Sequence, residues 1–262
     1  EFLQNQGRTF TLADQMQTAE LAKKVMKTYG MKGSVSQFLN QISLRKTAED
    51  TNGQTSLPES AFADYEAMMK EKNALDFDDL LLETLEILRE KADTKEAFPA
   101  FHYLLIDEFQ DINPVQYQLI RQWSRYAREV FVIGDPDQAI YGFRGSDAAC
   151  FEKLKQEEPQ LKTIRLTENY RSSGRIVRTA LRLISHNPGE ARELQALGEE
   201  GEKIRLVSCG SELSEAIFAA KEINRQVGGI DMLDTENGFA KETERKQKSF
   251  SDIGILYRTH AQ

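Results

Sequence analysis

The chain has 262 residues, of which 40% are hydrophobic and 29% are charged, a composition typical of globular proteins with one large or two small domains. The formal net charge of −8 argues against a wholly basic, histone-like nucleic-acid binder, although a local groove can still hold nucleic acid. No apolar run approaches the length of a membrane span, and no signal peptide is recognisable. The isolated Cys150 and Cys209 form no metal-ligand pattern, which excludes a zinc site and favours a reducing cytoplasm.

The first hundred residues are predicted to be helical. Apolar residues recur at helical spacing over residues 16–29, and Gly30 follows as a stop. Ser34 and Gln37 have the spacing of a capping box, which predicts a helix that begins just after Ser34. Two further helices are predicted: one has Pro58 in its first turn, and the other is capped by Asp76.

From about residue 100 the pattern changes to short apolar runs that alternate with helices. The predicted strands are residues 103–106, 129–133, 161–166, 203–208 and 252–257. The predicted helices are residues 114–123, 173–186 and 211–227, and residues 228–251 are expected to form a solvated loop. This alternation predicts an α/β fold with a parallel sheet.

Two adjacent carboxylates, Asp107 and Glu108, end the first of these strands. A buried strand would fix the backbone, so that Asp107 could hold Mg²⁺ through its water shell and Glu108 could polarise a water that attacks a terminal phosphate. The strand ends of α/β sheets are also where ligands bind. A plain solvated strand end fits the same residues equally well.

The next strand leads into a polar loop, residues 134–145, that carries Gln138, Tyr141, Phe143 and Arg144. Gln138 can donate to a phosphate oxygen and accept from water. Aromatic rings beside an arginine suit single-stranded nucleic acid, because bases stack on the rings and the guanidinium binds phosphate. A turn with core aromatics is the alternative.

A third junction joins a predicted strand to a helix and reads LTENYRSS over residues 166–173. Arg171 could reach a phosphate of a nucleotide bound on the neighbouring unit. Taken alone, such a turn is more often structural.

Taken in order, three segments closely resemble the central motifs of superfamily 1 DNA helicases of the UvrD/Rep/PcrA type: DEFQD, GDPDQAIYGFRG and ENYRSS. Residues 74–81 resemble the segment that precedes the first motif, and residues 253–262 resemble a later strand of the family. The resemblance covers about residues 60–262. It implies RecA-like, parallel-sheet motor domains of the P-loop NTPase type, with a helical N-terminal part.

The resemblance also implies a division of the chain. Residues 1–73 would belong to an inserted helical domain (1B-like), residues 74–160 to the later half of the first motor domain, and residues 161–262 to the start of the second. The chain contains no G-x-x-x-x-G-K-[ST] loop to cradle phosphates. We therefore expect an internal fragment that does not hydrolyse ATP by itself.

For the nucleotide site, the resemblance implies one role for each matched residue. Asp107 would position Mg²⁺, and Glu108, beside the metal, would be the catalytic base. Gln138 would sense the γ-phosphate and couple it to the DNA site. Tyr170 would lie against the adenine, and Arg171 would act as an arginine finger from the second motor domain.

For the DNA site, the resemblance implies that Tyr141 and Phe143 stack on bases with Arg144 beside them, and that Arg258 touches the strand. Two positions depart from the family: Phe143 stands where Trp is frequent, and His260 stands where Asn is typical, which puts a DNA contact by His260 in doubt.

The resemblance thus implies an ATP-dependent DNA helicase or translocase, with 3′–5′ polarity, that uses ATP and Mg²⁺ on single-stranded DNA and duplex junctions. Repair, replication or recombination proteins would be its partners, with no membrane involved. Two alternatives remain open: a non-catalytic DNA- or protein-binding module derived from a helicase, and a helicase fused to a nuclease domain further along.

Overall fold

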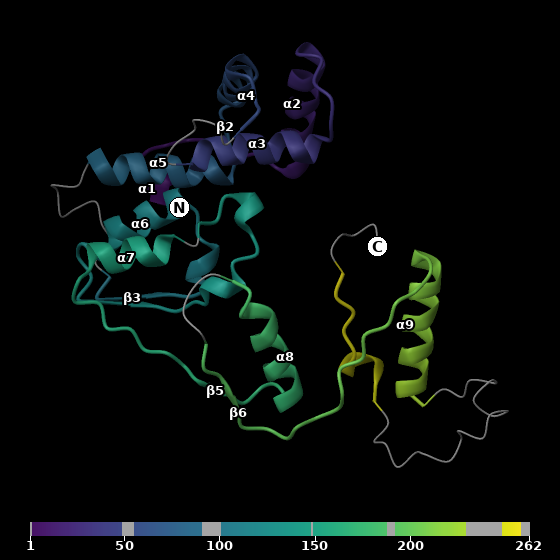
Figure 1. Ribbon diagram of the computed structural model, residues 1–262. Coiled ribbons are helices and arrows are strands. Elements are labelled where there is room, and N and C mark those ends of the chain that lie inside the picture. The colour runs from purple at the N-terminus through teal and green to yellow at the C-terminus, as the bar shows by residue number, and fades with distance from the viewer. Residues whose placement is uncertain are drawn as a thin grey trace, which may run out of the picture. The chain divides into compact units, whose positions relative to one another are not determined.

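A computed structural model describes residues 2–48, 55–90, 101–147, 149–187, 192–228 and 248–257 (Figure 1). The chain forms two compact units, residues 1–165 and residues 166–262. We describe each unit by itself. Within the described residues, no helix is long and apolar enough to cross a membrane.

The first unit is mainly helical. Its helices are α1 (Phe2–Asn5), α2 (Gln15–Thr28), α3 (Val35–Thr47), α4 (Glu59–Glu71), α5 (Phe77–Glu90), α6 (Pro114–Ser124) and α7 (Cys150–Glu157). The predicted capping box of α3 is confirmed, since the Ser34 hydroxyl accepts from Gln37 N and the Gln37 side chain accepts from Ser34 N. Asp76 also caps α5 as predicted, through Asp79 N. The prediction for Pro58 is wrong by one position, because α4 begins at Glu59 and Pro58 only precedes its first turn.

Helices α2, α3 and α4 share one apolar core. Its buried side chains include Leu21, Val25, Phe38, Ile42, Ala61 and Tyr65, and Met16, which has helical spacing in the sequence, is instead 73% exposed. The rings of Phe38 and Tyr65 meet edge to face, with centroids 6.0 Å apart. This core fixes the position of α3, which also contacts the loop that contains Phe143.

The strands pair in parallel, as the alternating pattern predicts. Strand β1 (Thr11–Leu12) pairs with β2 (Ala74–Leu75), and β3 (Tyr103–Ile106) pairs with β4 (Glu129–Val132). Helices α6 and α7 pack on one face of the β3–β4 sheet (Figure 1). The buried contacts on that face come from Leu104, Ile106, Val132, Tyr117, Ile120, Cys150 and Leu154.

From residue 161 onward, a stretch that includes the second unit, the described residues form fewer strands than predicted. Helices α8 (Gly174–Ile184) and α9 (Glu212–Gln226) confirm the predicted helices, and β5 (Glu168–Asn169) pairs in parallel with β6 (Gln195–Ala196). Residues 161–166 and 203–208 form no strand, and residues 252–257 begin in a short 3₁₀ turn, Phe250–Asp252, with no strand after it. A strand needs a neighbour to complete its hydrogen bonds, and in the described part of the chain these apolar segments have none.

Candidate functional site

The candidate site lies where β3 and β4 end. These strands are parallel, with Ile106 opposite Val132, so the residues that follow them meet at the same edge of the sheet. Two backbone hydrogen bonds continue the pairing past the strands: Ile133 N donates to Ile106 O (2.8 Å), and Phe109 N donates to Ile133 O (3.0 Å). The segment after β3 and the segment after β4 are therefore fixed against each other.

Asp107 and Glu108 are both exposed at this edge. Glu108 has a backbone φ of 51°, in the left-handed region, which costs a non-glycine residue about 1–2 kcal/mol. The turn is held by Glu108 N, which donates to Asp107 Oδ1 (2.9 Å), and by Asp111 N, which donates to Glu108 O (2.9 Å). The chain therefore leaves the strand direction at Glu108, and both carboxylates are exposed to solvent.

Gln110 connects the ends of the two strands by hydrogen bonds from a buried position. Its side chain is buried, with the residue 2% exposed. Its Nε2 donates to Glu108 Oε2 (2.6 Å), and its Oε1 accepts from Asp135 N (2.9 Å). One amide therefore holds the Glu108 carboxylate and the start of the following loop.

Gly134 is required for this arrangement. A Cβ at this position would lie 2.6 Å from Gln110 Oε1, 2.9 Å from Phe151 Cζ and 3.0 Å from Phe109 N. These distances are shorter than van der Waals contact, so any side chain would displace the amide or the ring.

Asp135 extends the connection to Gln138. Asp135 Oδ2 accepts from Gln138 Nε2 (2.8 Å), and Asp135 Oδ1 accepts from Asp137 N (3.1 Å), which closes the 3₁₀ turn Pro136–Gln138. Glu108, Gln110, Asp135 and Gln138 thus form one hydrogen-bonded chain across both strand ends. Gln138 itself is exposed.

The aromatic pair follows in the same loop. Tyr141 is 38% exposed and Phe143 is 59% exposed, so neither is the core aromatic of the alternative interpretation. Their ring centroids lie 6.2 Å apart, with an interplanar angle of 51°. The backbone of Arg144 completes the 3₁₀ turn Gly142–Arg144; its side chain is outside the described part of the structure.

The second unit carries two further predicted residues. Tyr170 and Arg171 follow β5 in the second unit, and both are exposed. The Tyr170 hydroxyl donates to the Glu168 carboxylate, which raises the pKa of Tyr170 above its ordinary value. Arg258 and His260 lie outside the described residues.

Sequence comparison matches nearly the whole chain to one family. The UvrD/REP helicase N-terminal domain matches residues 4–159, and the UvrD-like helicase C-terminal domain matches residues 164–262. The chain belongs to the UvrD/REP helicase family.

It is 29% identical to an ATP-dependent DNA helicase PcrA of Staphylococcus epidermidis over 272 residues, which cover 97% of this chain and 35% of that relative. For PcrA of Staphylococcus aureus the identity is 29% over 269 residues, with 97% and 34% covered. The chain thus spans about a third of the length of these relatives, and the resemblance inferred from the motifs is confirmed.

Asp107 is the residue at this site that could hold a magnesium ion together with nucleotide. Among the residues that the structure describes, no three His, Cys, Asp or Glu side chains come together as a metal site. Mg²⁺ keeps several waters and takes one or two carboxylates plus phosphate oxygens. Asp107, exposed at a strand end with one oxygen bonded to Glu108 N, suits that role.

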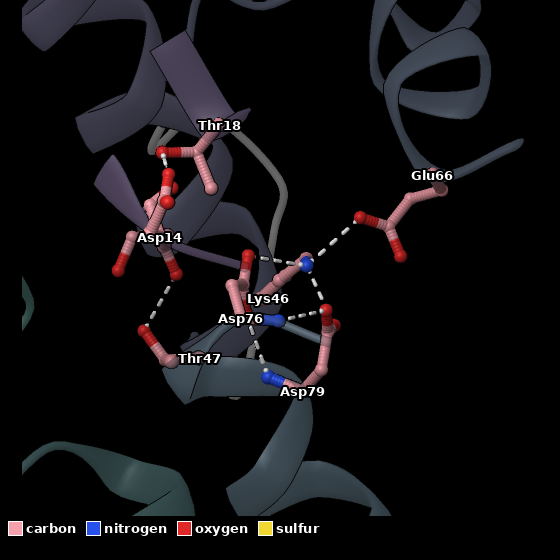
Figure 2. A network of polar contacts seen from close by, with 8 residues as sticks. Asp14, Thr18, Lys46, Thr47, Glu66, Asp76 and Asp79 are labelled. Atoms are coloured by element: carbon pink, nitrogen blue, oxygen red, sulfur yellow. Dashed lines mark hydrogen bonds and ion pairs between the residues drawn. The ribbon is translucent and has the colours of Figure 1, made fainter. Parts of the chain in front are cut away.

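An ion cluster centred on buried Lys46 lies among the helices α3, α4 and α5 of this UvrD/REP family chain (Figure 2). Lys46 Nζ lies 2.9 Å from Glu66 Oε1, 2.9 Å from Asp76 Oδ2 and 2.6 Å from Asp79 Oδ1, and its side chain is 2% exposed. Burial lowers the pKa of Lys46, but the three carboxylates outweigh burial and the net shift is upward. The cluster ties α3 to α4 and to the start of α5.

Sequence reasoning missed Gln110, Asp135 and the contacts of α3. Gln110 and Asp135 stand inside the quoted motifs, and a polar residue between buried Phe109 and the next helix was an available signal for Gln110. The contact that α3 makes with Phe143 through Asn40 had no local signal, because the two residues lie 103 positions apart in the chain.

Proposed function

We propose that the protein containing this chain is an ATP-dependent DNA helicase or translocase that moves 3′–5′ on single-stranded DNA. One observation carries the proposal: a hydrogen-bonded chain from Glu108 to Gln138 spans two parallel strand ends, and the exposed pair Tyr141 and Phe143 follows in the same loop. Groups suited to phosphate chemistry and groups suited to base stacking thus share one short segment.

In the proposed reaction Glu108 is the general base. Gln110 occupies Glu108 Oε2, which leaves Oε1 to accept a proton from the water that attacks the γ-phosphate of ATP. Mg²⁺, held by Asp107, would neutralise charge on the β- and γ-phosphates. Gln138, exposed and oriented by Asp135, would contact the γ-phosphate through its remaining amide atoms.

The second unit would complete the nucleotide site. We propose that Tyr170 stacks against the adenine, that Arg171 reaches the γ-phosphate, and that Arg258 and His260 touch DNA. The proposed division is an inserted helical domain in residues 1–73, a first motor domain in residues 74–160 and a second in residues 161–262.

The exposed face of the β3–β4 sheet supports a RecA-like first motor domain. Leu105 is 71% exposed and Phe131 is 53% exposed, although both lie in strands. Parallel sheets normally have both faces covered, and helices α6 and α7 cover only the opposite face. We propose that a further layer of the same motor domain covers Leu105 and Phe131.

ATP hydrolysis by the product of the full reading frame tests the proposal. We expect hydrolysis that needs Mg²⁺ and is stimulated by oligo-dT, and a loss of at least about 100-fold in Glu108→Gln, the range for removal of a general base. Glu129→Gln is the matched control, since Glu129 is exposed at the opposite end of the adjacent strand β4.

One result would contradict the role of Glu108, and another would contradict the motor function. Hydrolysis in Glu108→Gln equal to that in Glu129→Gln would remove Glu108 from the reaction. DNA binding without any DNA-stimulated hydrolysis in the full product would instead support the non-catalytic binding module.

A further inference from the structure

Helix α3 contacts the backbone of the aromatic loop directly. Asn40 Nδ2 donates to Phe143 O at 3.0 Å, a contact between residues 103 positions apart in the chain. Phe143 O belongs to the peptide unit that follows the exposed ring. The bond therefore restrains the backbone from which that ring projects.

A second contact places the end of the loop on the same face of α3. Gly145 has a φ of +89°, and a Cβ there would lie 3.3 Å from Leu44 Cδ2 and 3.3 Å from Thr47 Oγ1. Positions 40, 44 and 47 share one face of a helix. The loop therefore lies along α3 from Phe143 to Gly145.

Helix α3 is itself immobilised. Phe38 and Ile42 are buried in the core with α2 and α4. At the end of the helix, Lys46 is bonded to Asp76 and Asp79 at the start of α5. A loop bonded to α3 is therefore bonded to a rigid support.

We propose that Asn40 is a positioning residue for single-stranded DNA: by holding the Phe143 carbonyl, it fixes the Tyr141 and Phe143 rings in the arrangement that accepts bases. The inference rests on the proposed role of these rings in DNA binding. A loop already ordered in its bound conformation loses less entropy when DNA binds. Asn40 itself need not touch DNA.

The test is the affinity of the purified chain for fluorescein-labelled oligo-dT, measured by fluorescence anisotropy at low salt. Loss of one hydrogen bond predicts that Asn40→Ala binds about 3- to 10-fold more weakly. Phe143→Ala should bind at least about 5-fold more weakly through lost stacking. Ser36→Ala, an exposed position one turn earlier on α3, is the matched control and should bind like the parent chain.

A second readout separates positioning from general stability. In a Trp123→Phe, Phe143→Trp background, where residue 143 is the single tryptophan, the emission should become more accessible to acrylamide when Asn40→Ala is added, with an unchanged unfolding midpoint. Asn40→Leu, which keeps the branched shape of the side chain without a donor, replaces Asn40→Ala if the latter does not fold.

The outcomes distinguish the inference from the proposed function. Weaker binding by Phe143→Ala together with parental binding by Asn40→Ala and Asn40→Leu would overturn the role of Asn40 and leave the DNA site standing. Parental binding by Phe143→Ala would overturn the proposed DNA role of the loop, and the inference with it.

Discussion

Replacing Gly134 by alanine should destabilise the first unit selectively. The added methyl would lie within 3.0 Å of three atoms: Gln110 Oε1, Phe151 Cζ and Phe109 N. The ring of Phe151 packs edge to face on Phe109 at a centroid distance of 5.0 Å, and Phe109 is fully buried. Moving any of these groups away from the methyl would break a contact or hydrogen bond that the buried site now makes.

The magnitude follows from what must move. Overpacking of a close-packed site costs about 1–3 kcal/mol. If Gln110 moves away, its bond to Asp135 N is lost as well, which adds about 1 kcal/mol. We therefore expect Gly134→Ala to lower the free energy of unfolding by about 2–4 kcal/mol, a large share of a domain's usual stability of about 5–15 kcal/mol.

Urea denaturation followed by tryptophan fluorescence measures this loss. Trp123 is the single tryptophan of the chain, and it lies on α6 beside the buried Leu85, Leu88 and Leu119, so its emission reports the first unit. Gly142→Ala is the matched control, since nothing lies within 4 Å of a Cβ there. An unfolding free energy for Gly134→Ala within about 0.5 kcal/mol of that for Gly142→Ala, the usual scatter of surface substitutions, would refute the packing argument.

Three further outcomes are expected. Lys46→Met should destabilise the first unit by about 3 kcal/mol at pH 7 in thermal or urea unfolding, because three carboxylates would lose their shared cation. Burial raises the pKa of Glu66 and Asp79, and Lys46 opposes that rise. Without Lys46 these pKa values rise further, so the folded variant takes up protons at higher pH than the parent does, and the loss of stability should shrink as pH falls from 7 towards 4. Lys70→Met, at an exposed position, should show neither effect. Asn113→Ala should cost about 1 kcal/mol in urea, since Asn113 Oδ1 caps α6 by accepting from Gln116 N at 2.8 Å. The purified chain alone should show no Mg²⁺-dependent ATP turnover in a phosphate-release assay, and turnover that disappears in Glu108→Gln would contradict this expectation.

Local patterns predicted the elements whose causes are local. The α3 capping box involves only Ser34 and Gln37, and β3 was predicted from its apolar run with the bounds that the structure shows. Residues 203–208 were also predicted to be a strand, from Ile204, Leu206 and Val207, but they form none. The difference is the neighbouring strand: β3 forms its hydrogen bonds with β4. A local sequence pattern does not specify such a neighbour.

The candidate site divides in the same way. Asp107 and Glu108 were predicted because a strand end with two carboxylates has a recognisable sequence. The contact of Asn40 with Phe143 was not predictable, because 103 residues separate its partners and one of them is a backbone carbonyl. Interactions with the backbone leave no mark on the identity of the residue that accepts them.

The loop from Asp135 to Gly145 is held at both ends and exposed between them. At one end Asp135 N is bonded to buried Gln110; at the other, Phe143 O is bonded to Asn40. Gln138 and Tyr141 lie between these supports. If Gln138 moves on contact with a γ-phosphate, as the proposed function requires, neither end can absorb the displacement, and the backbone that carries Tyr141 must take it up. A loop with one free end would instead relax at that end, so the two supports are what would allow a change at the nucleotide to reach a base stacked on Tyr141.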